Sequence, residues 1–162
     1  MALDRTKQPG IKIGQIFLEE AHFNHRADYL NLPPSTPVSV GDVHVQVQTG
    51  LSADLKRGLV RVRVSTIPGS KPMYELRVAM TALVTVDEAA PNMPLDRYLA
   101  SSGAALLFPF VRELVANLTW RGRFGPLWLS PTNLLAPLAA APPSARLAAA
   151  VGRKPQTARK RR

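Results

Sequence analysis

Apolar and polar residues alternate along the first half of the chain, which is the pattern of β-strands that bury one face and expose the other. Val60, Val62 and Val64 alternate with arginine and serine. Residues 73–86 repeat the pattern over a longer stretch, in which every second residue from Tyr74 onward is apolar. Both segments are predicted to be half-buried strands.

Two further segments alternate with interruptions, and both are also predicted to be strands. In residues 11–23, Ile16 and Leu18 break the phase of the other apolar residues, so we expect either a bulge or a strand that is covered on both faces. In residues 38–49 the phase changes near Gly41, and a glycine at such a change again suggests a bulge.

Turn-forming residues separate these strands. Residues 32–37 are rich in proline, and residues 68–72 combine proline with glycine, serine and lysine. Four consecutive strands joined by tight turns favour an antiparallel meander.

The second half of the chain has a helical period. Residues 106–120 form the main predicted helix, because apolar residues recur there three and four positions apart. These residues are Leu107, Phe110, Val111, Leu114, Val115 and Leu118. Pro109 marks the first turn or a kink, and Gly122 is expected to end the helix. Shorter helical segments are expected over residues 95–99 and 131–141, so the predicted class is α+β.

The net charge of +10 belongs mostly to the C-terminal end. All 11 acidic residues lie at or before Glu113 with 12 of the 21 Lys and Arg, which leaves that part at +1. Seven of the remaining 9 basic residues fall within 146–162, so a high pI says little about what the folded part binds. We expect a disordered N-terminus over residues 1–10, one domain over 11–141 and a flexible basic tail over 142–162.

Composition excludes several classes of protein. The chain contains no cysteine, which rules out a disulfide framework, a zinc–thiolate site and a cysteine nucleophile. The N-terminus lacks the apolar core of a signal peptide. No apolar run reaches the roughly 20 residues that span a bilayer; the longest, residues 103–111, contains Pro109. We therefore expect a soluble, cytoplasmic protein with no integral membrane segment.

Candidate catalytic and metal-binding residues are few. His22 and His25 lie near Glu19, Glu20 and Asp28 in the sequence, and imidazole and carboxylate are both zinc ligands. Residues three apart in a strand face opposite ways, however, so we expect these side chains to be solvated or hydrogen-bonded. Neither a Gly-x-Ser-x-Gly elbow nor a glycine-rich phosphate loop occurs. We expect neither an enzyme nor a bound cofactor.

Residues 106–138, LLFPFVRELVANLTWRGRFGPLWLSPTNLLAPL, carry a specific resemblance to a known family. A Leu-Phe-Pro-aromatic-x-Arg-Glu helix start precedes Arg-Gly-x-Phe and then Leu-x-Leu-x-Pro-x-Asn. The matching residues are Leu107, Phe108, Pro109, Phe110, Arg112, Glu113, Arg121, Gly122, Phe124, Leu127, Leu129, Pro131 and Asn133. In this run the chain resembles the SecB family of protein-export chaperones, and the likeness extends over about residues 11–140.

The resemblance implies a four-stranded antiparallel sheet with helices on one face. It also implies a homotetramer, built as a dimer of dimers. Members of the family bind unfolded preproteins without ATP or a cofactor, keep them export-competent and pass them to the ATPase SecA. The long helix is expected to supply an oligomer interface through Leu107, Phe110, Val111, Leu114 and Leu118.

In this family SecA docks a basic tail on acidic residues of the sheet face. Glu20 occupies one matching position with Glu19 beside it, and Glu75 stands where an apolar residue is usual. Asn24 and Arg77 stand where acidic residues are usual. The expected SecA-type face is therefore Glu19, Glu20 and Glu75, with altered charges around them.

A chaperone of unfolded chains needs exposed apolar surface, because hydrophobic contact is non-directional. Trp120, Phe124 and Trp128 cluster around two glycines and are the candidate client-binding surface, together with Phe17 and Leu83 from the strands. The alternative is that the three aromatic residues cap the sheet core or an oligomer interface. Pairing of an extended client with a sheet edge is a second route of binding.

The residues leave three functions open. The first is a holdase that delivers preproteins to the Sec translocase. The second is a SecB-like chaperone dedicated to one client, such as the antitoxin of a toxin–antitoxin pair, which the altered sheet-face charges favour. The third is nucleic-acid binding through the basic tail, which would depend strongly on salt. That tail has no aromatic residue for stacking and no recognised motif.

Overall fold

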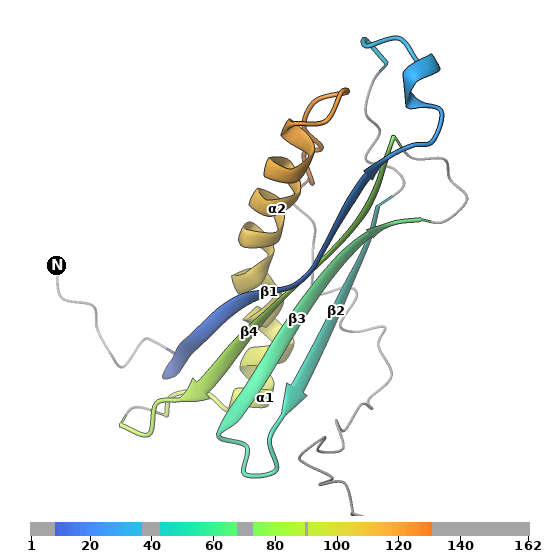
Figure 1. The fold of residues 1–162 in the computed structure, drawn as a ribbon. Helices are drawn as coiled ribbons and strands as arrows, with labels where there is room; N and C mark the ends of the chain where they lie inside the picture. The colour runs from blue at the N-terminus through green and yellow to red at the C-terminus, as the bar shows by residue number, and fades with distance from the viewer. Residues whose placement is uncertain (1–8, 37–42, 68–72, 90, 131–162) are drawn as a thin grey trace, which may run out of the picture.

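A four-stranded sheet and one long helix make up the part of the chain that the computed structural model describes, residues 9–36, 43–67, 73–89 and 91–130 (Figure 1). The elements in chain order are β1 (Ile11–His25), η2 (Tyr29–Asn31), β2 (Val43–Leu51), β3 (Arg57–Thr66), β4 (Tyr74–Val86), α1 (Leu95–Tyr98), η3 (Leu99–Gly103) and α2 (Ala104–Trp120). The predicted α+β class, the four antiparallel strands and the long helix are confirmed.

Some predicted segments lie outside the described residues. They are the N-terminus up to residue 8, the first part of the second strand over 38–42, the turn over 68–72, the helix over 131–141 and the tail over 142–162. Within the described part, the second strand begins at Val43, and the main helix begins at Ala104, slightly before the predicted start. Gly10 already belongs to the folded part, because its carbonyl accepts a 2.8 Å hydrogen bond from the backbone N–H of Asp87.

The strands are ordered β1-β4-β3-β2 across the sheet. β2, β3 and β4 form the predicted meander, but β1 pairs with β4 and not with β2, so the prediction of a meander through all four strands is wrong. The segment between β1 and β2 is long enough to cross the sheet, which removes the constraint that a tight turn places on neighbouring strands. The resulting order is that of a Greek key.

β1 contains two bulges, where its register with β4 shifts at Gly14 and at Glu19. An extra residue at each point reverses the side on which the following side chains lie. Ile16 and Leu18 therefore share the side of the sheet that faces the helix, whereas Phe17 takes the opposite side. The bulges account for the interrupted alternation of this strand.

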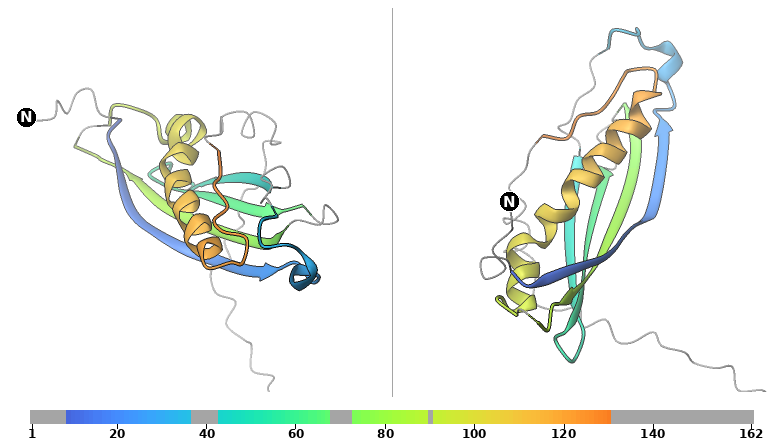
Figure 2. Two further views of the ribbon diagram at one scale, coloured as in Figure 1. Left: turned by 90° about the horizontal axis from the view of Figure 1, so that it is seen from above. Right: turned by 90° about the vertical axis from the view of Figure 1, so that its left-hand side faces the viewer.

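α2 packs across one face of the sheet, over β3 and β4 (Figure 2). Val60, Val62 and Val64 of β3 are fully buried on that face, as their alternation predicts. Leu107 and Val111 of α2 are fully buried in the same core. The helix-covered side of the sheet is termed the inner face below, and the opposite side the outer face.

The helical segment Leu95–Trp120 is 26 residues long and, by length and composition alone, apolar enough to span a membrane. The apolar runs in the sequence predict no segment of this length, because a run counts only uninterrupted apolar residues. Pro109 and charged residues interrupt such a run, but they do not end the helical segment. Leu107, Val111 and Val115 are fully buried on the sheet, so the segment serves as a core helix here. Pro109 lies inside α2 on its exposed side.

Shortening a buried helix residue should destabilise the fold. Leu107→Ala removes a fully buried side chain, and we expect the free energy of unfolding to fall by about 2–5 kcal/mol. Urea unfolding at one fixed protein concentration measures this loss. Leu30→Ala is the control, because Leu30 is 68% exposed and its truncation should change stability by less than about 0.5 kcal/mol. Equal losses in the two variants would show that Leu107 is not a core residue.

Candidate functional site

The residues predicted to bind clients divide between two places in the fold. Phe17 and Leu83 lie on the outer face of the sheet, on the neighbouring strands β1 and β4, where Phe17 is paired with Thr81 and Leu83 with Gln15. Trp120, Phe124 and Trp128 lie at the end of α2 and in the segment that follows it. The structure does not bring the five residues together, because the bulges of β1 turn Phe17 away from the helix.

Tyr74 anchors the segment that follows α2. Its hydroxyl donates a hydrogen bond to the carbonyl of Gly125 (2.8 Å) and accepts one from the backbone N–H of Phe124 (3.0 Å). Gly122 makes room for this contact, since a Cβ at that position would lie 2.6 Å from the Tyr74 hydroxyl oxygen. Burial raises the pKa of Tyr74 above its usual value of 10.0, which keeps the hydroxyl protonated as a donor.

The ring of Phe124 is part of this anchor. It lies 6.1 Å from the ring of Tyr74 between centroids and packs against the edge of the core. The alternative considered for the aromatic residues, that they cap the core, therefore holds for Phe124. It does not hold for Trp120 and Trp128, whose side chains are 67% and 61% exposed.

A second anchor is Thr119, a polar residue that is fully buried. Its hydroxyl donates a hydrogen bond to the Val115 carbonyl (2.7 Å) and accepts one from the backbone N–H of Leu127 (2.8 Å). Trp120 directly follows Thr119, and Trp128 directly follows Leu127. The hydrogen bond thus fixes two adjoining backbone segments, each of which presents an exposed indole.

The segment after β1 contacts the segment that follows α2. The backbone N–H of Arg123 donates to Nε2 of His25 (3.2 Å), and the Arg123 guanidinium donates to the carbonyl of Leu32 (3.1 Å). His25 in turn stacks on Tyr29, with 4.6 Å between ring centroids. Leu30, which follows Tyr29 in the sequence, is exposed. Two segments far apart in the sequence are therefore joined where apolar side chains face solvent.

Ile13 and Leu18 belong to the exposed apolar surface, although the sequence pattern did not single them out. They lie on the inner side of β1 and are 49% and 47% exposed, because α2 covers β3 and β4 and reaches β1 only slightly. Phe110 is 43% exposed on α2. Ile13, Leu18, Phe110, Trp120 and Trp128 are termed the inner apolar surface. The broken alternation at Gly14 was the available signal.

Two of the helix residues assigned to an oligomer interface are unavailable for one. Leu107 and Val111 are fully buried in the chain's own core, so their assignment is corrected. The helical period marks apolar residues that face the core as well as those that face away, and periodicity alone does not separate the two sets. Leu114 and Leu118 are half-buried along the flank of α2, and with Phe110 they stay the proposed interface.

Glu19, predicted to belong to an acidic docking face, is engaged on the outer face by an arginine. Its carboxylate lies 2.6 Å from Arg61 Nε and accepts hydrogen bonds from Arg61 Nη2 and Thr81 Oγ1, both at 2.8 Å. The hydrogen bond from Arg61 lowers the pKa of Glu19 below its usual value of 4.5, against the opposing effect of desolvation. This carboxylate is not free to receive a basic partner.

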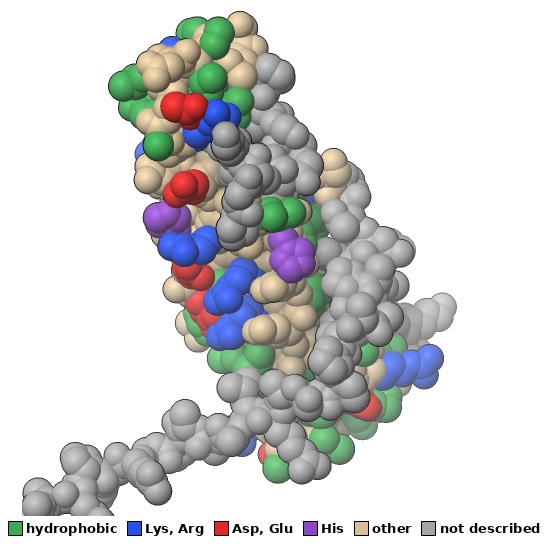
Figure 3. All heavy atoms as spheres, turned by 90° about the vertical axis from the view of Figure 1, so that its right-hand side faces the viewer, with side chains coloured by type: hydrophobic (Ala, Val, Ile, Leu, Met, Phe, Trp, Pro, Cys, Tyr) green, Lys and Arg blue, Asp and Glu red, His purple; other side chains and the backbone are tan. Residues whose placement is uncertain are grey.

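Glu20 is engaged in the same way. It lies 3.4 Å from Arg77 Nε and 3.6 Å from Arg63 Nη2. Glu75 is exposed and makes no ion pair with another described residue. The interleaving of cationic and anionic side chains is visible in Figure 3.

Cations outnumber carboxylates on the outer face. By register, the four strands place five Lys and Arg and three Glu on it, a formal balance of +2. These residues are Lys12, Arg57, Arg61, Arg63, Arg77, Glu19, Glu20 and Glu75. Asp87 and Asp54, just outside the strands, pair with Lys12 (2.9 Å) and Arg57 (4.0 Å), so the face that the resemblance implied to be acidic carries interleaved charges of both signs.

The histidines do not converge on a site. His22 and His25 lie on opposite faces of β1, as expected for residues three apart, and His44 lies on β2. Among the described residues, no group of three or more His, Asp or Glu side chains is arranged to hold a metal ion.

Removing the Tyr74 hydroxyl should weaken the attachment of the segment after α2. Tyr74→Phe keeps the ring but leaves the Phe124 N–H and the Gly125 carbonyl without their partner, at a cost of about 1–3 kcal/mol. Urea unfolding measures the cost, and tryptophan emission reports on the segment. Tyr29→Phe is the matched control and should leave stability unchanged. The anchor is disproved if Tyr74→Phe behaves like the control.

The pair of Glu19 and Arg61 should make stability depend on pH. Because the folded-state pKa of Glu19 is depressed, its contribution is present above the usual value of 4.5 and is lost as pH falls through the folded pKa. Glu19→Gln should lower the free energy of unfolding at neutral pH, and its difference from wild type should shrink in acid. Urea unfolding at a series of pH values tests this, with Glu75→Gln as the control. A difference that is constant with pH would contradict it.

Comparison with known proteins places these features in a family. The model of the family described as preprotein translocase subunit SecB matches residues 4–139. The protein-export protein SecB of Afipia carboxidovorans is 26% identical over 111 residues, which cover 63% of this chain and 68% of that protein. The protein-export protein SecB of Anaplasma marginale is 24% identical over 136 residues, which cover 76% of this chain and 78% of that protein.

Among solved structures, the Rv1957 SecB-like chaperone of Mycobacterium tuberculosis, in complex with a ChAD peptide from the HigA1 antitoxin, is 20% identical, with a TM-score of 0.47. The match covers 80% of this chain and 97% of that one. The family match takes in the sheet as well as the helix, so it extends beyond the motifs of residues 106–138. The chain belongs to the SecB family of preprotein translocase subunits.

Proposed function

We propose that this chain is an ATP-independent chaperone that binds unfolded preproteins, keeps them translocation-competent and delivers them to the SecA/Sec translocase. Its membership of the SecB family supports the chaperone role. The observation that carries the proposal is the inner apolar surface, whose five side chains are 43% to 67% exposed. A chain that uses this surface to bind polypeptide needs no catalytic residue, and we propose that it is not an enzyme.

The energetics of the inner apolar surface fit a holdase. Covering the exposed part of Trp120 or Trp128 contributes about 2–4 kcal/mol at roughly 25 cal/mol per Å². Such contacts are non-directional and accept many client sequences. The anchors at Tyr74 and Thr119 hold the backbone beneath the indoles, so little of this energy is lost in ordering the binding segment.

Self-association is part of the proposal. An apolar surface of this kind has to be partly covered between clients to keep the protein soluble. We propose a homotetramer, built as a dimer of dimers, in which Phe110, Leu114 and Leu118 of α2 contribute to the interface. The site of action in the proposal is the cytoplasm, where unfolded preproteins await export.

The step that involves SecA finds less support on this molecule than client binding does. Glu19 and Glu20, the residues proposed to receive a basic SecA segment, already pair with Arg61, Arg63 and Arg77. A basic segment has to displace those arginines, and only Glu75 is open to it. We therefore expect SecA to bind this face weakly and in a salt-sensitive manner.

A chaperone dedicated to one client is the second candidate function. The observation that favours it is the same set of arginine–glutamate pairs, which removes the acidic character of the docking face. A dedicated chaperone keeps the inner apolar surface but has no need to hand its client to SecA. An antitoxin of a toxin–antitoxin pair is the client proposed for this case.

Suppression of aggregation tests the proposed function. The purified chain should prevent a denatured preprotein from aggregating on dilution, equally with and without ATP. A double change of Trp120→Ser and Trp128→Ser should weaken this several-fold, because two exposed indoles are lost. Leu55→Ser is the matched control, since Leu55 is 60% exposed but lies in the turn between β2 and β3.

Two further readouts decide between the candidates. Light scattering on the same sample should give the mass of a tetramer. Protection of several unrelated preproteins supports the export chaperone, whereas protection of a single client supports the dedicated one. A monomer that protects no unfolded protein would overturn both.

A further inference from the structure

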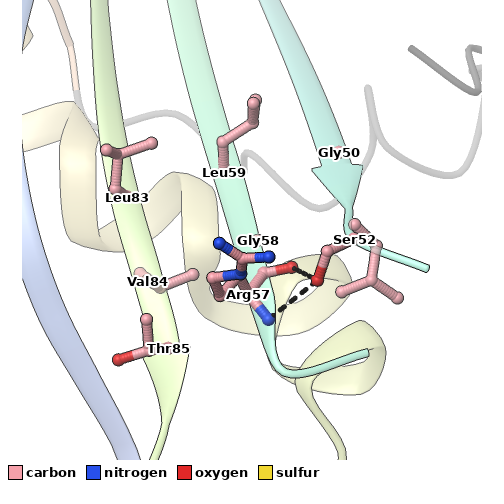
Figure 4. Close-up of a pocket in the computed structure, with 9 residues that line it drawn as sticks. Gly50, Ser52, Arg57, Gly58, Leu59, Leu83, Val84 and Thr85 are labelled. Carbon is pink, nitrogen blue, oxygen red and sulfur yellow. Dashed lines mark hydrogen bonds between the residues drawn. The ribbon is translucent and has the colours of Figure 1, made fainter. Parts of the chain in front are cut away.

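The outer face of the sheet contains an apolar hollow near the turn between β2 and β3 (Figure 4). Leu59 and Leu83 occupy paired positions of β3 and β4 there, and Gly50 is paired with Leu59 on the other side. Gly50, Leu59 and Leu83 thus lie side by side on β2, β3 and β4. Because Gly50 has no side chain, space is left on the outer face beside the two leucines. The hollow has a volume of about 410 Å³ and a mostly apolar lining, and it is open to solvent. It is termed the outer hollow.

The outer hollow is an unusual place for leucine. Leu83 is paired with Gln15 of β1 and lies between Thr81 and Thr85 on its own side of β4, yet it is 39% exposed. The volume lies within the range of about 300–1,000 Å³ that is usual for ligand sites. An open hollow on a flat sheet suits one apolar side chain of an extended polypeptide better than an enclosed small molecule.

Arg57 gives the outer hollow its charge. It lines the hollow, its side chain is 73% exposed, and its nearest carboxylate, that of Asp54, is 4.0 Å away. The other outer-face arginines have closer partners, at 2.6 Å for Arg61 and 3.4 Å for Arg77. Arg57 is therefore the arginine of this face that is most available to an incoming carboxylate.

We propose that the outer hollow binds an extended segment of a partner protein in which a large aliphatic side chain lies close to one or more carboxylates. The aliphatic side chain enters beside Leu59 and Leu83, and a carboxylate pairs with Arg57. Arg57, whose nearest carboxylate is 4.0 Å away, favours an acidic segment over a basic one. This site is separate from the inner apolar surface, on the opposite side of the sheet.

Charge and composition argue against other occupants. The chain's own residues 142–162 are basic and contain no acidic residue, so they offer no carboxylate to Arg57. A second copy of the chain that docked through the same surface would meet Arg57 with a face on which Glu19 and Glu20 already pair with arginines. Nucleic acid would use aromatic stacking in addition to phosphate contacts, and the lining of the hollow contains no aromatic residue.

Fluorescence anisotropy with two short fluorescein-labelled peptides tests the proposal on the full chain. One peptide consists of Leu, Asp, Glu and Ser, and in the other each Asp and Glu is replaced by Lys. Wild-type protein should bind the acidic peptide and not the lysine peptide, and added salt should weaken binding. Arg57→Glu should weaken binding of the acidic peptide about tenfold, the effect of one lost charge contact.

Two variants separate the apolar contribution from the electrostatic one. Leu83→Gln should also weaken binding several-fold while leaving the charge unchanged, and Leu30→Gln, at the far end of the sheet, should have no effect. Arg57→Glu should still suppress aggregation of a denatured preprotein, which separates this site from the proposed client surface. Equal binding of the two peptides, unchanged binding by Arg57→Glu, or displacement of the peptide by polyuridylate would overturn the proposal.

Discussion

One geometric limit shapes this protein: a single helix cannot cover a four-stranded sheet. An α-helix with its side chains is about 10–12 Å wide, whereas the axes of the two edge strands lie about 14 Å apart at a spacing of roughly 4.8 Å. α2 therefore buries the inner face of β3 and β4 and leaves that of β1 partly open. The exposure of Ile13 and Leu18 is a direct result of this limit.

The uncovered surface is held in place by a small number of polar contacts. Tyr74 and Thr119 are buried, and each uses its hydroxyl to bind the backbone of the segment that follows α2. Residues 121–130 belong to no helix or strand, and the two hydroxyls supply hydrogen-bond partners for part of their backbone. In this way Trp120 and Trp128 face solvent from a fixed backbone.

The two faces of the sheet have different physical characters, which divides possible partners between them. The inner side offers exposed apolar side chains, and in the proposed function it binds unfolded polypeptide of many sequences. The outer face carries interleaved charges of both signs and one apolar hollow. Asn24 and Arg77 stand on this face where the family resemblance implied acidic residues, while the fold is kept.

The local pattern of the sequence determined the four strands, the long helix and the burial of residues such as Val62, because periodicity reports which side chains share a face. The motifs around Pro109 identified the family. Only the tertiary structure decided that β1 pairs with β4 and that Glu19 binds Arg61, 42 positions away in the sequence. Periodicity is a property of one segment, whereas strand order, the faces reset by bulges and ion pairs between strands depend on which segments meet after the chain has closed on itself.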